Sequence, residues 1–254
     1  MHSIQHENKA QKQEKTVSSY SNFRPLSSIS IKAIIFDMDG LMFDTETLNA
    51  AAWKAAGKLH GFEMTDELLR AHIGFNVEAT KKLMQNHFGP GFDFDAVRSD
   101  RIAHSLKHIE ENGMPLKPGL RELLAYLDEK KITTAIVTSS GERFVRFYLE
   151  HAALGHEFDV IVSGDKVKKS KPEPDIFLTA LAELGVGADE CLVLEDSYNG
   201  ITAAHRAGIR AVMVPDLLPP TPEIEKLFFR KADALTDVIP LIESLNSPMG
   251  NSPS

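Results

Sequence analysis

The chain has 254 residues, of which 43% are hydrophobic and 25% are charged, and its formal net charge is −8. This composition is typical of a globular protein, and the negative charge argues against the basic surfaces that bind nucleic acids and anionic membranes. No apolar run is long enough to span a bilayer, and the single cysteine, Cys191, excludes an internal disulfide, so we expect a cytoplasmic protein that binds neither nucleic acid nor membrane.

The two ends of the chain differ in composition from its middle. Residues 1–30 are rich in Ser, Gln, Lys and His without a clear hydrophobic period, and residues 247–254 consist mostly of Ser, Pro, Gly and Asn. We expect both segments to be disordered, because neither has the apolar side chains to form a core. The N-terminal segment lacks the apolar centre of a secretory signal, and Glu7 and Glu14 count against a transit peptide.

The stretch Ile31–Thr45 organises the rest of the chain. Its apolar run stops at Asp37 and Asp39, and Gly40 follows directly. In a strand these two carboxylates point the same way, and the glycine lets the backbone turn immediately after them. An acidic turn after a strand is the other interpretation of such a pattern. Two adjacent anions repel, so we expect a cation or a shared proton between them.

A helical period begins after the carboxylates and continues, without a strand, to about residue 112. Glycine and proline breakers divide it into four expected helices, near Glu46–His60, Asp66–His72, Val77–Phe88 and Phe94–Glu111. The sequence therefore predicts a four-helix domain over residues 45–113, inserted into a core domain of residues 31–44 and 114–246. A domain inserted at this point would cover the carboxylates.

The core domain continues with strands that alternate with helices. After the first strand we expect Ile132–Val137, Phe158–Val162, Cys191–Leu194 and Ile209–Val214, and then a short final strand and helix within Ala232–Leu245. This alternation predicts an α/β fold, a Rossmann-like parallel sheet with helices on both faces.

The second strand is followed by Thr138, Ser139, Ser140 and Gly141. Ser139 and Glu142 have the spacing of a capping box, which would bring hydroxyl groups and free backbone N–H groups together at a helix N-terminus. That arrangement is either an anion site or ordinary helix capping.

Several polar residues follow the ends of the expected strands. Because the carboxyl ends of parallel strands share one edge of a sheet, we expect these side chains to converge there. They are Asp37, Asp39, Thr138, Ser139, Lys171, Glu195 and Asp196. Buried carboxylates this close together need a divalent cation, and a set of oxygen donors without His or Cys favours Mg²⁺.

This ordered set resembles the motifs of the haloacid dehalogenase (HAD) superfamily of phosphoryl-transfer enzymes. The matching residues are Asp37-Met-Asp39-Gly40, Thr138 at a strand end, Lys171 in Ser-Lys-Pro-Glu-Pro, and Glu195-Asp196. The helical insertion resembles the cap of the phosphoglycolate phosphatase and β-phosphoglucomutase branch. The resemblance extends from about Ile31 to Leu245.

The resemblance implies a role for each motif. Asp37 would be the nucleophile that forms an aspartyl-phosphate, and Asp39 would protonate the leaving oxygen and then deprotonate the attacking water. Thr138 and the helix N-terminus after Ser139 would hold phosphate oxygens, and Lys171 would neutralise the transferring group. The presence of Asp39 argues against dehalogenase chemistry, whose enzymes lack this second aspartate.

The same resemblance implies how Mg²⁺ would be held. Its ligands would be the Asp37 carboxylate, the backbone carbonyl of Asp39 and Asp196, with Glu195 either a further ligand or a neighbour of the ligands.

Three positions in the expected cap can be compared with the corresponding residues of a β-phosphoglucomutase. Thr45 matches the mutase residue beside the site, but Asn49 stands where the mutase has a catalytic histidine. Val77 stands where the mutase has an arginine for the second phosphate. These departures favour a phosphatase that acts on a small phosphate monoester of the sugar or polyol type, with β-phosphoglucomutase activity as the alternative.

We expect residues of the cap to select the substrate, among them Glu46, His72, Phe75 and Asn76, with Thr45 and Glu46 nearest the phosphate. We expect a monomer or a weak dimer. An inactive phosphate-binding module would lack one of the motif residues, and none is missing. A phospho-accepting receiver domain is disfavoured because a long helical block follows the first strand.

Overall fold

The computed structural model describes residues 30–73, 75, 77–155 and 157–247. The disorder expected for residues 1–29 and 248–254, and the role expected for Asn76, lie outside the described residues. The chain divides into two compact units. The core unit contains the segment up to Met42, Lys117–Glu142 and the segment after Gly155, and the helical unit contains Phe43–Leu116 and Arg143–Gly155. The helical unit thus includes residues 143–155, which the sequence analysis places in the core.

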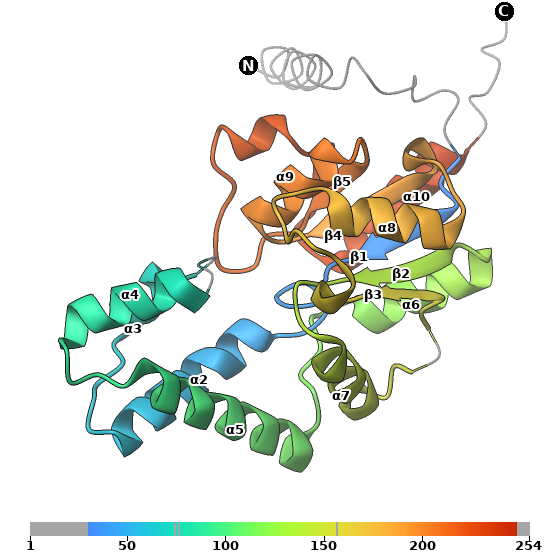
Figure 1. Ribbon diagram of the computed structural model, residues 1–254. Coiled ribbons are helices and arrows are strands. Elements are labelled where there is room, and N and C mark those ends of the chain that lie inside the picture. The colour runs from blue at the N-terminus through green and yellow to red at the C-terminus, as the bar shows by residue number, and fades with distance from the viewer. Residues whose placement is uncertain (1–29, 74, 76, 156, 248–254) are drawn as a thin grey trace, which may run out of the picture. The chain divides into compact units, whose positions relative to one another are not determined.

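A parallel six-stranded sheet forms the centre of the core unit (Figure 1), with the strand order β3-β2-β1-β4-β5-β6. The strands are β1 (Ala33–Phe36), β2 (Thr133–Val137), β3 (Val160–Val162), β4 (Cys191–Glu195), β5 (Arg210–Met213) and β6 (Arg230–Lys231). All the pairings are parallel, and Ile35 of β1 lies opposite Ala135 and Val193. The two central neighbours of β1 therefore carry their carboxyl ends to the same edge.

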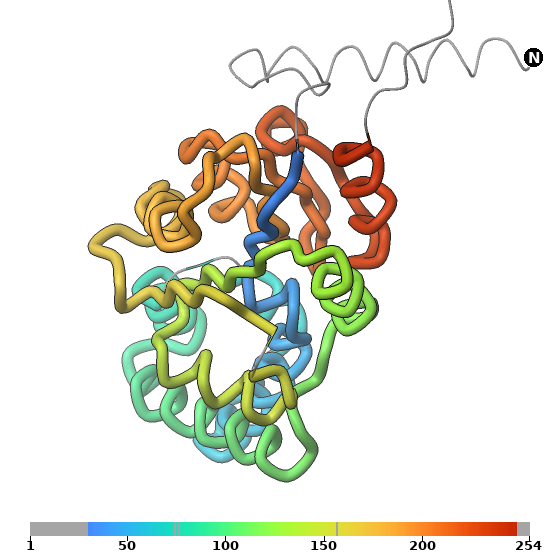
Figure 2. Tube along the Cα trace, turned by 90° about the vertical axis from the view of Figure 1, so that its right-hand side faces the viewer, coloured from blue at the N-terminus to red at the C-terminus, as the bar shows by residue number. Residues whose placement is uncertain are grey.

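Apolar side chains on both faces of the strands explain the layered arrangement. Every residue of β1 is fully buried, as expected for a strand covered by helices on both sides. Figure 2 shows α8 on one side of β1, and α6 and α10 on the other. The core-unit helices are α6 (Leu120–Lys130), α8 (Asp175–Leu184), α9 (Tyr198–Arg206) and α10 (Val238–Asn246). The α/β fold with helices on both faces is confirmed.

The sequence located the last strand incorrectly. We expected it after Ala232, but β6 comprises Arg230–Lys231 and pairs with Val212–Met213 of β5. Both residues of β6 are exposed, so no apolar pattern marks this strand, and only its pairing at the sheet edge defines it. The third strand is shorter than expected and begins at Val160.

The helical unit contains α2 (Thr45–Leu59), α3 (Asp66–Ala71), α4 (Val77–Phe88), α5 (Phe94–Asn112) and most of α7 (Glu142–Ala152). The ends of the first four lie within one residue of the expected helices. Side-chain caps explain where three of them begin: Asp44, Thr65 and Asp93 each accept a hydrogen bond from a backbone N–H of the first turn.

An aromatic core holds the helical unit together. Trp53 of α2 and Phe94 of α5 are buried with their ring centroids 5.9 Å apart, and Met84 of α4 is fully buried in the same cluster.

Among the described residues, no helix of either unit is long and apolar enough to cross a membrane.

Candidate active site

The first candidate residue, Asp37, directly follows β1. Its backbone N–H donates a hydrogen bond to the carbonyl of Leu194 at 3.0 Å, so the pairing of β1 with β4 continues up to the carboxylate. Gly40 then adopts a positive φ of 84°, and a Cβ atom at this position would lie 2.3 Å from Oδ2 of Asp196. A glycine is required here because any side chain would displace Asp196.

Lys171 connects the two acidic strand ends. Its Nζ donates to Oδ1 of Asp37 at 2.5 Å and to Oε1 of Glu195 at 2.6 Å, and it also lies 3.3 Å from the carbonyl oxygen of Val137. The lysine side chain is only 5% exposed. A buried ammonium is stable only with such partners, so the ends of β1, β2 and β4 share one cation.

Glu195 and Asp196 are neighbours in the sequence with different surroundings. Glu195 is fully buried, and its Oε2 accepts hydrogen bonds from both the backbone N–H and the hydroxyl of Ser197, while Oε1 accepts from Lys171. Both of its carboxylate oxygens are therefore in use. In contrast, Oδ1 of Asp196 is buried and has no hydrogen-bond partner among the described residues.

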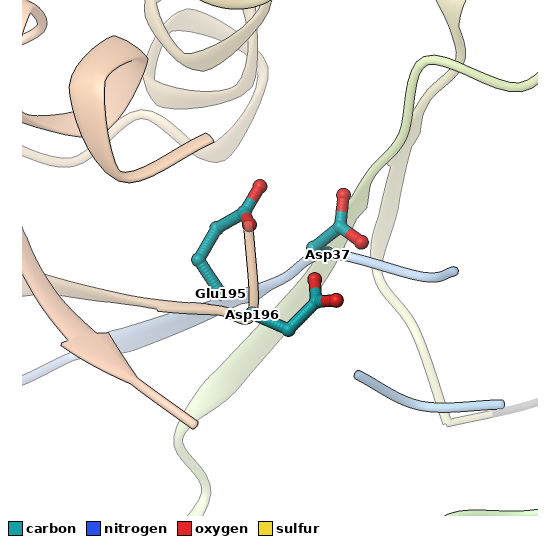
Figure 3. Close-up of side chains that lie close together, drawn as sticks. All are labelled: Asp37, Glu195 and Asp196. Atoms are coloured by element: carbon teal, nitrogen blue, oxygen red, sulfur yellow. The ribbon is translucent and has the colours of Figure 1, made fainter. Parts of the chain in front are cut away.

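Three carboxylates lie together at this edge. One oxygen each of Asp37, Glu195 and Asp196 lies within 4.8 Å of the others. Figure 3 shows Asp196 directed towards the side of Asp37, whereas the Glu195 side chain leaves the strand in a different direction. This difference follows from the alternation of side chains along a strand.

Burial and the repulsion between neighbouring carboxylates disfavour the ionised forms of the acids in this cluster. Burial, together with the nearby Glu195 and Asp39, raises the pKa of Asp37 to about 8, although Lys171 opposes the shift. Burial and the neighbouring carboxylates also raise the pKa of Asp196 well above its ordinary value. Burial alone would lower the pKa of Lys171, but Asp37 and Glu195 outweigh it and hold the pKa above its usual range. One ammonium is too little positive charge for this set of acids.

The cluster fits a divalent cation. The donors are all carboxylate oxygens, which suit Mg²⁺. The buried Oδ1 of Asp196 lacks a hydrogen-bond partner in the described part of the chain, and a bound cation would give this oxygen a partner. A cation beside Asp37 and Asp196 would also favour the ionised forms that burial opposes.

Asp39 lies against the loop that follows β2. Its Oδ2 accepts hydrogen bonds from the hydroxyl of Ser140 at 2.8 Å and from the hydroxyl of Thr138 at 3.3 Å. Thr138 is buried and Ser140 is half-buried. Ser140 was not among the residues expected from the sequence. The signal that could have pointed to it is its place as the second of two consecutive serines after Thr138.

The capping box expected at Ser139 and Glu142 is wrong. The backbone N–H of Glu142 donates instead to the carboxylate of Asp165, at 2.8 Å. Ser139 is exposed, and its backbone packs closely on Gly164. A Cβ atom at Gly164 would lie 2.4 Å from the carbonyl oxygen of Ser139. Asp165 lies 23 positions further along the chain, in the short 3-10 helix Gly164–Lys166, so no local pattern reveals this cap.

A second ion pair lies near the acidic edge and was also missed by the sequence analysis. Nζ of Lys117 donates to Oδ1 of Asp216 at 2.7 Å, and the side chains are 23% and 10% exposed. Oδ2 of Asp216 would lie 3.5 Å from a Cβ at Gly40. This pair therefore flanks the turn that follows the first two aspartates.

The residues expected to select the substrate belong to the helical unit, which contains a cavity of about 190 Å³. Its lining includes Glu46, Asn49, Trp53, His72 and Phe75 together with Arg98 and Arg101. The Arg101 guanidinium lies 5.4 Å from the Trp53 ring and donates to the side-chain oxygen of Asn49 at 2.6 Å. Thr45 is buried at the start of α2, in the same unit.

Known proteins with similar sequences cover most of the chain. Residues 34–214 match the family described as Haloacid dehalogenase-like hydrolase. A phosphorylated carbohydrates phosphatase of Thermotoga maritima is 32% identical over 182 residues, which cover 72% of this chain and 84% of the relative. A probable pseudouridine-5'-phosphatase of Drosophila melanogaster is 35% identical over 192 residues, which cover 72% of this chain and 80% of the relative.

A solved structure is similar over the whole of its length. It is described as a putative beta-phosphoglucomutase from Thermotoga maritima and is 28% identical, with a TM-score of 0.73. The match covers 84% of this chain and 99% of that structure.

Proposed function

Because this chain belongs to the haloacid dehalogenase-like hydrolase family, we propose that it is a magnesium-dependent phosphatase that acts on a small phosphorylated metabolite of the sugar or polyol type. The observation that carries the proposal is the buried cluster in which Lys171 bridges Asp37 and Glu195 beside Asp196. This cluster places a nucleophile, a fixed positive charge and candidate ligands for a cation at the end of one parallel sheet.

Asp37 is the proposed nucleophile. Its carboxylate oxygen would form a bond to phosphorus while the bond from phosphorus to the leaving oxygen breaks, which gives an aspartyl-phosphate. Lys171 holds the Asp37 side chain at 2.5 Å and would cancel part of the charge of the approaching phosphoryl group. A carboxylate and a phosphoryl group repel, so this neutralisation is needed for attack.

Asp39 is the proposed acid and base. It would give its proton to the leaving oxygen in the first step, and in the second step it would take a proton from the water that hydrolyses the aspartyl-phosphate. Thr138 is the proposed donor to a phosphoryl oxygen, because its hydroxyl lies next to Asp39.

We propose that Asp37, Asp196 and the backbone carbonyl of Asp39 hold Mg²⁺, which when bound supplies positive charge for the phosphoryl oxygens and for the ionised Asp37. Glu195 is proposed as the partner that fixes Lys171, because its Oε1 accepts a hydrogen bond from Lys171 and its Oε2 accepts hydrogen bonds from Ser197. Of the two roles that the sequence left open for Glu195, this geometry supports the neighbour of the ligands.

The substrate class rests on the relatives. Their names describe phosphatases of phosphorylated carbohydrates and of a nucleoside phosphate, both small phosphate monoesters. Mutase activity is the alternative that a solved structure's description suggests. Asn49 disfavours it: the amide oxygen accepts a hydrogen bond from Arg101, and an amide group, unlike an imidazole, does not take up or release a proton near neutral pH.

The test is phosphate release from a panel of sugar, polyol and nucleoside monophosphates, with and without Mg²⁺. We expect release that requires Mg²⁺ and is concentrated on one group of substrates. The panel includes β-glucose 1-phosphate, and its products are analysed for isomerisation. Isomerisation without release would favour the mutase, and no reaction with any substrate would favour a phosphate-binding module.

A further inference from the structure

Two hydroxyl groups share one oxygen of Asp39. The Ser140 hydroxyl donates to Oδ2 at 2.8 Å, and the Thr138 hydroxyl donates to the same atom at 3.3 Å. The backbone N–H of Ser140 donates to Oγ1 of Thr138 at 3.0 Å. The three residues therefore form a closed set of hydrogen bonds, in which the contact from Ser140 to Asp39 is the shorter of the two hydroxyl bonds.

The two hydroxyls cannot have the same role during the reaction. A hydroxyl group has one proton to donate, so Thr138 can donate either to Asp39 or to a phosphoryl oxygen. If Thr138 binds the phosphoryl group, as proposed above, Asp39 loses that hydrogen bond. The Ser140 hydroxyl keeps its hydrogen bond to Oδ2.

We propose that Ser140 is a positioning residue that holds the Asp39 carboxyl group in place for proton transfer while Thr138 turns to the phosphoryl group. This inference rests on the proposed phosphatase function. An aspartate side chain has two rotatable bonds, so a carboxyl group without this contact would spend time in rotamers that do not reach the leaving oxygen.

The loop that carries Ser140 is itself fixed. The carbonyl of Ser140 accepts a hydrogen bond from the backbone N–H of Gly164 at 3.0 Å. The carboxylate of Asp165 accepts from the N–H of Glu142, just beyond Ser140. The close packing of Ser139 on Gly164 adds a third contact. The hydroxyl is therefore presented from a rigid support, as positioning requires.

The affected step is the proton transfer that accompanies attack. As an oxygen of Asp37 bonds to phosphorus and the ester bond breaks, the proton of Asp39 moves to the leaving oxygen. An alkoxide is a poor leaving group and needs this proton, whereas p-nitrophenolate leaves readily without it. A residue that positions the acid matters for the first kind of ester and not for the second.

The experiment compares Ser140→Ala with the unchanged protein on a sugar or polyol monophosphate and on p-nitrophenyl phosphate, in the presence of Mg²⁺. The measured quantity is kcat/KM, which reports on the steps up to the aspartyl-phosphate. We expect kcat/KM to fall about tenfold on the alkyl ester and less than about twofold on the aryl ester. Ser140→Thr, which keeps a hydroxyl, should restore most of the loss.

Two further variants separate positioning from general damage. Ser244→Ala makes the same chemical change on the exposed face of α10, and kcat/KM on both esters should be unchanged. In an Asp39→Asn background, Ser140→Ala should cause no additional selective loss, because the group it positions has gone.

An equal fall on both esters, no fall on either, or an undiminished selective loss in the Asp39→Asn background would each overturn the role of Ser140. These outcomes are distinct from a failure of the proposed function. That failure would appear as no release of phosphate by the unchanged protein from either ester, and the inference would fall with it.

Discussion

The acidic edge of the core unit and the cavity of the helical unit each contain a half-buried or buried cation, and the side chains that contact the cation differ in chemistry. At the edge, Lys171 lies between the carboxylates of Asp37 and Glu195. In the cavity, Arg101 lies over the Trp53 ring and donates to the neutral amide of Asn49. The edge thus places its cation between two carboxylates, and the cavity places its cation against an aromatic face and an amide.

This difference predicts different sensitivities. Removing one charge from a buried ionic cluster leaves the others uncompensated, so substitutions at the edge should be severe. In the cavity, the half-buried Arg101 contacts an aromatic ring and a neutral amide, so neutral replacement of that amide should be tolerated. We therefore expect edge substitutions to act on turnover and cavity substitutions to act on substrate affinity.

The largest expected effect comes from the nucleophile. Asp37→Asn keeps the size of the side chain but removes the charge that attacks phosphorus, and we expect kcat to fall by at least about 10⁴-fold. Phosphate release at saturating Mg²⁺ measures this. Thermal unfolding serves as the control for folding, and retention of full turnover would contradict the assignment of Asp37.

The next comparison separates the two neighbouring acids on β4. Asp196→Asn should raise the Mg²⁺ concentration needed for half-maximal activity by about 10- to 100-fold, because it weakens a proposed ligand. Glu195→Gln should instead lower kcat and the stability of the fold, because buried Lys171 loses a charged partner.

Magnesium titrations and thermal melting of both variants distinguish the two roles. If Glu195→Gln changed the Mg²⁺ requirement as much as Asp196→Asn, Glu195 would be a ligand rather than the partner of Lys171.

A smaller effect concerns pH and stability. The pKa of Asp37 is about 8 in the folded protein against an ordinary value of 3.8. A carboxyl group whose pKa is higher in the folded than in the unfolded protein adds most to the free energy of unfolding at pH values below its pKa in the unfolded protein. This contribution is lost as the pH rises towards its pKa in the folded protein. The Tm of the metal-free protein should therefore fall by a few degrees from pH 5 to pH 8.

Two comparisons check the origin of this fall. Asp37→Asn should show a smaller decrease in Tm over the same pH range, because its side chain does not titrate. Added Mg²⁺ should raise the Tm of the unchanged protein more at pH 8 than at pH 5, since it binds the ionised carboxylates. A Tm independent of both pH and Mg²⁺ would contradict the charge cluster as described.

The smallest expected effect lies in the cavity. Asn49→Ala removes the acceptor of the Arg101 hydrogen bond, and we expect KM for the preferred substrate to change by about threefold to tenfold with kcat nearly constant. Steady-state kinetics on that substrate measure the change. A loss of kcat comparable to that of Asp37→Asn would place Asn49 among the catalytic residues and erase the contrast between the two regions.

Much of the fold followed from local patterns in the sequence. The apolar run before Asp37 predicted a strand that is buried on both faces, because such strands must be covered by helices. Helices α2 to α5 of the helical unit were predicted within one residue, because capping side chains and glycine breakers are local signals. The short edge strand Arg230–Lys231 has no such signal and is defined only by its pairing with β5.

For the candidate site, the sequence identified which acids follow the strands, since parallel topology brings strand ends to one edge. Only the tertiary structure decided which partner each acid receives. Asp39 and Ser140 are 101 positions apart, and Asp165 reaches Glu142 from the short 3-10 helix Gly164–Lys166. The adjacent residues Glu195 and Asp196 differ because Lys171 and Ser197 donate hydrogen bonds to the Glu195 carboxylate, whereas no group of the described residues donates one to Oδ1 of Asp196. Hydrogen-bond partners depend on distances in space, whereas a sequence pattern records only spacing along the chain.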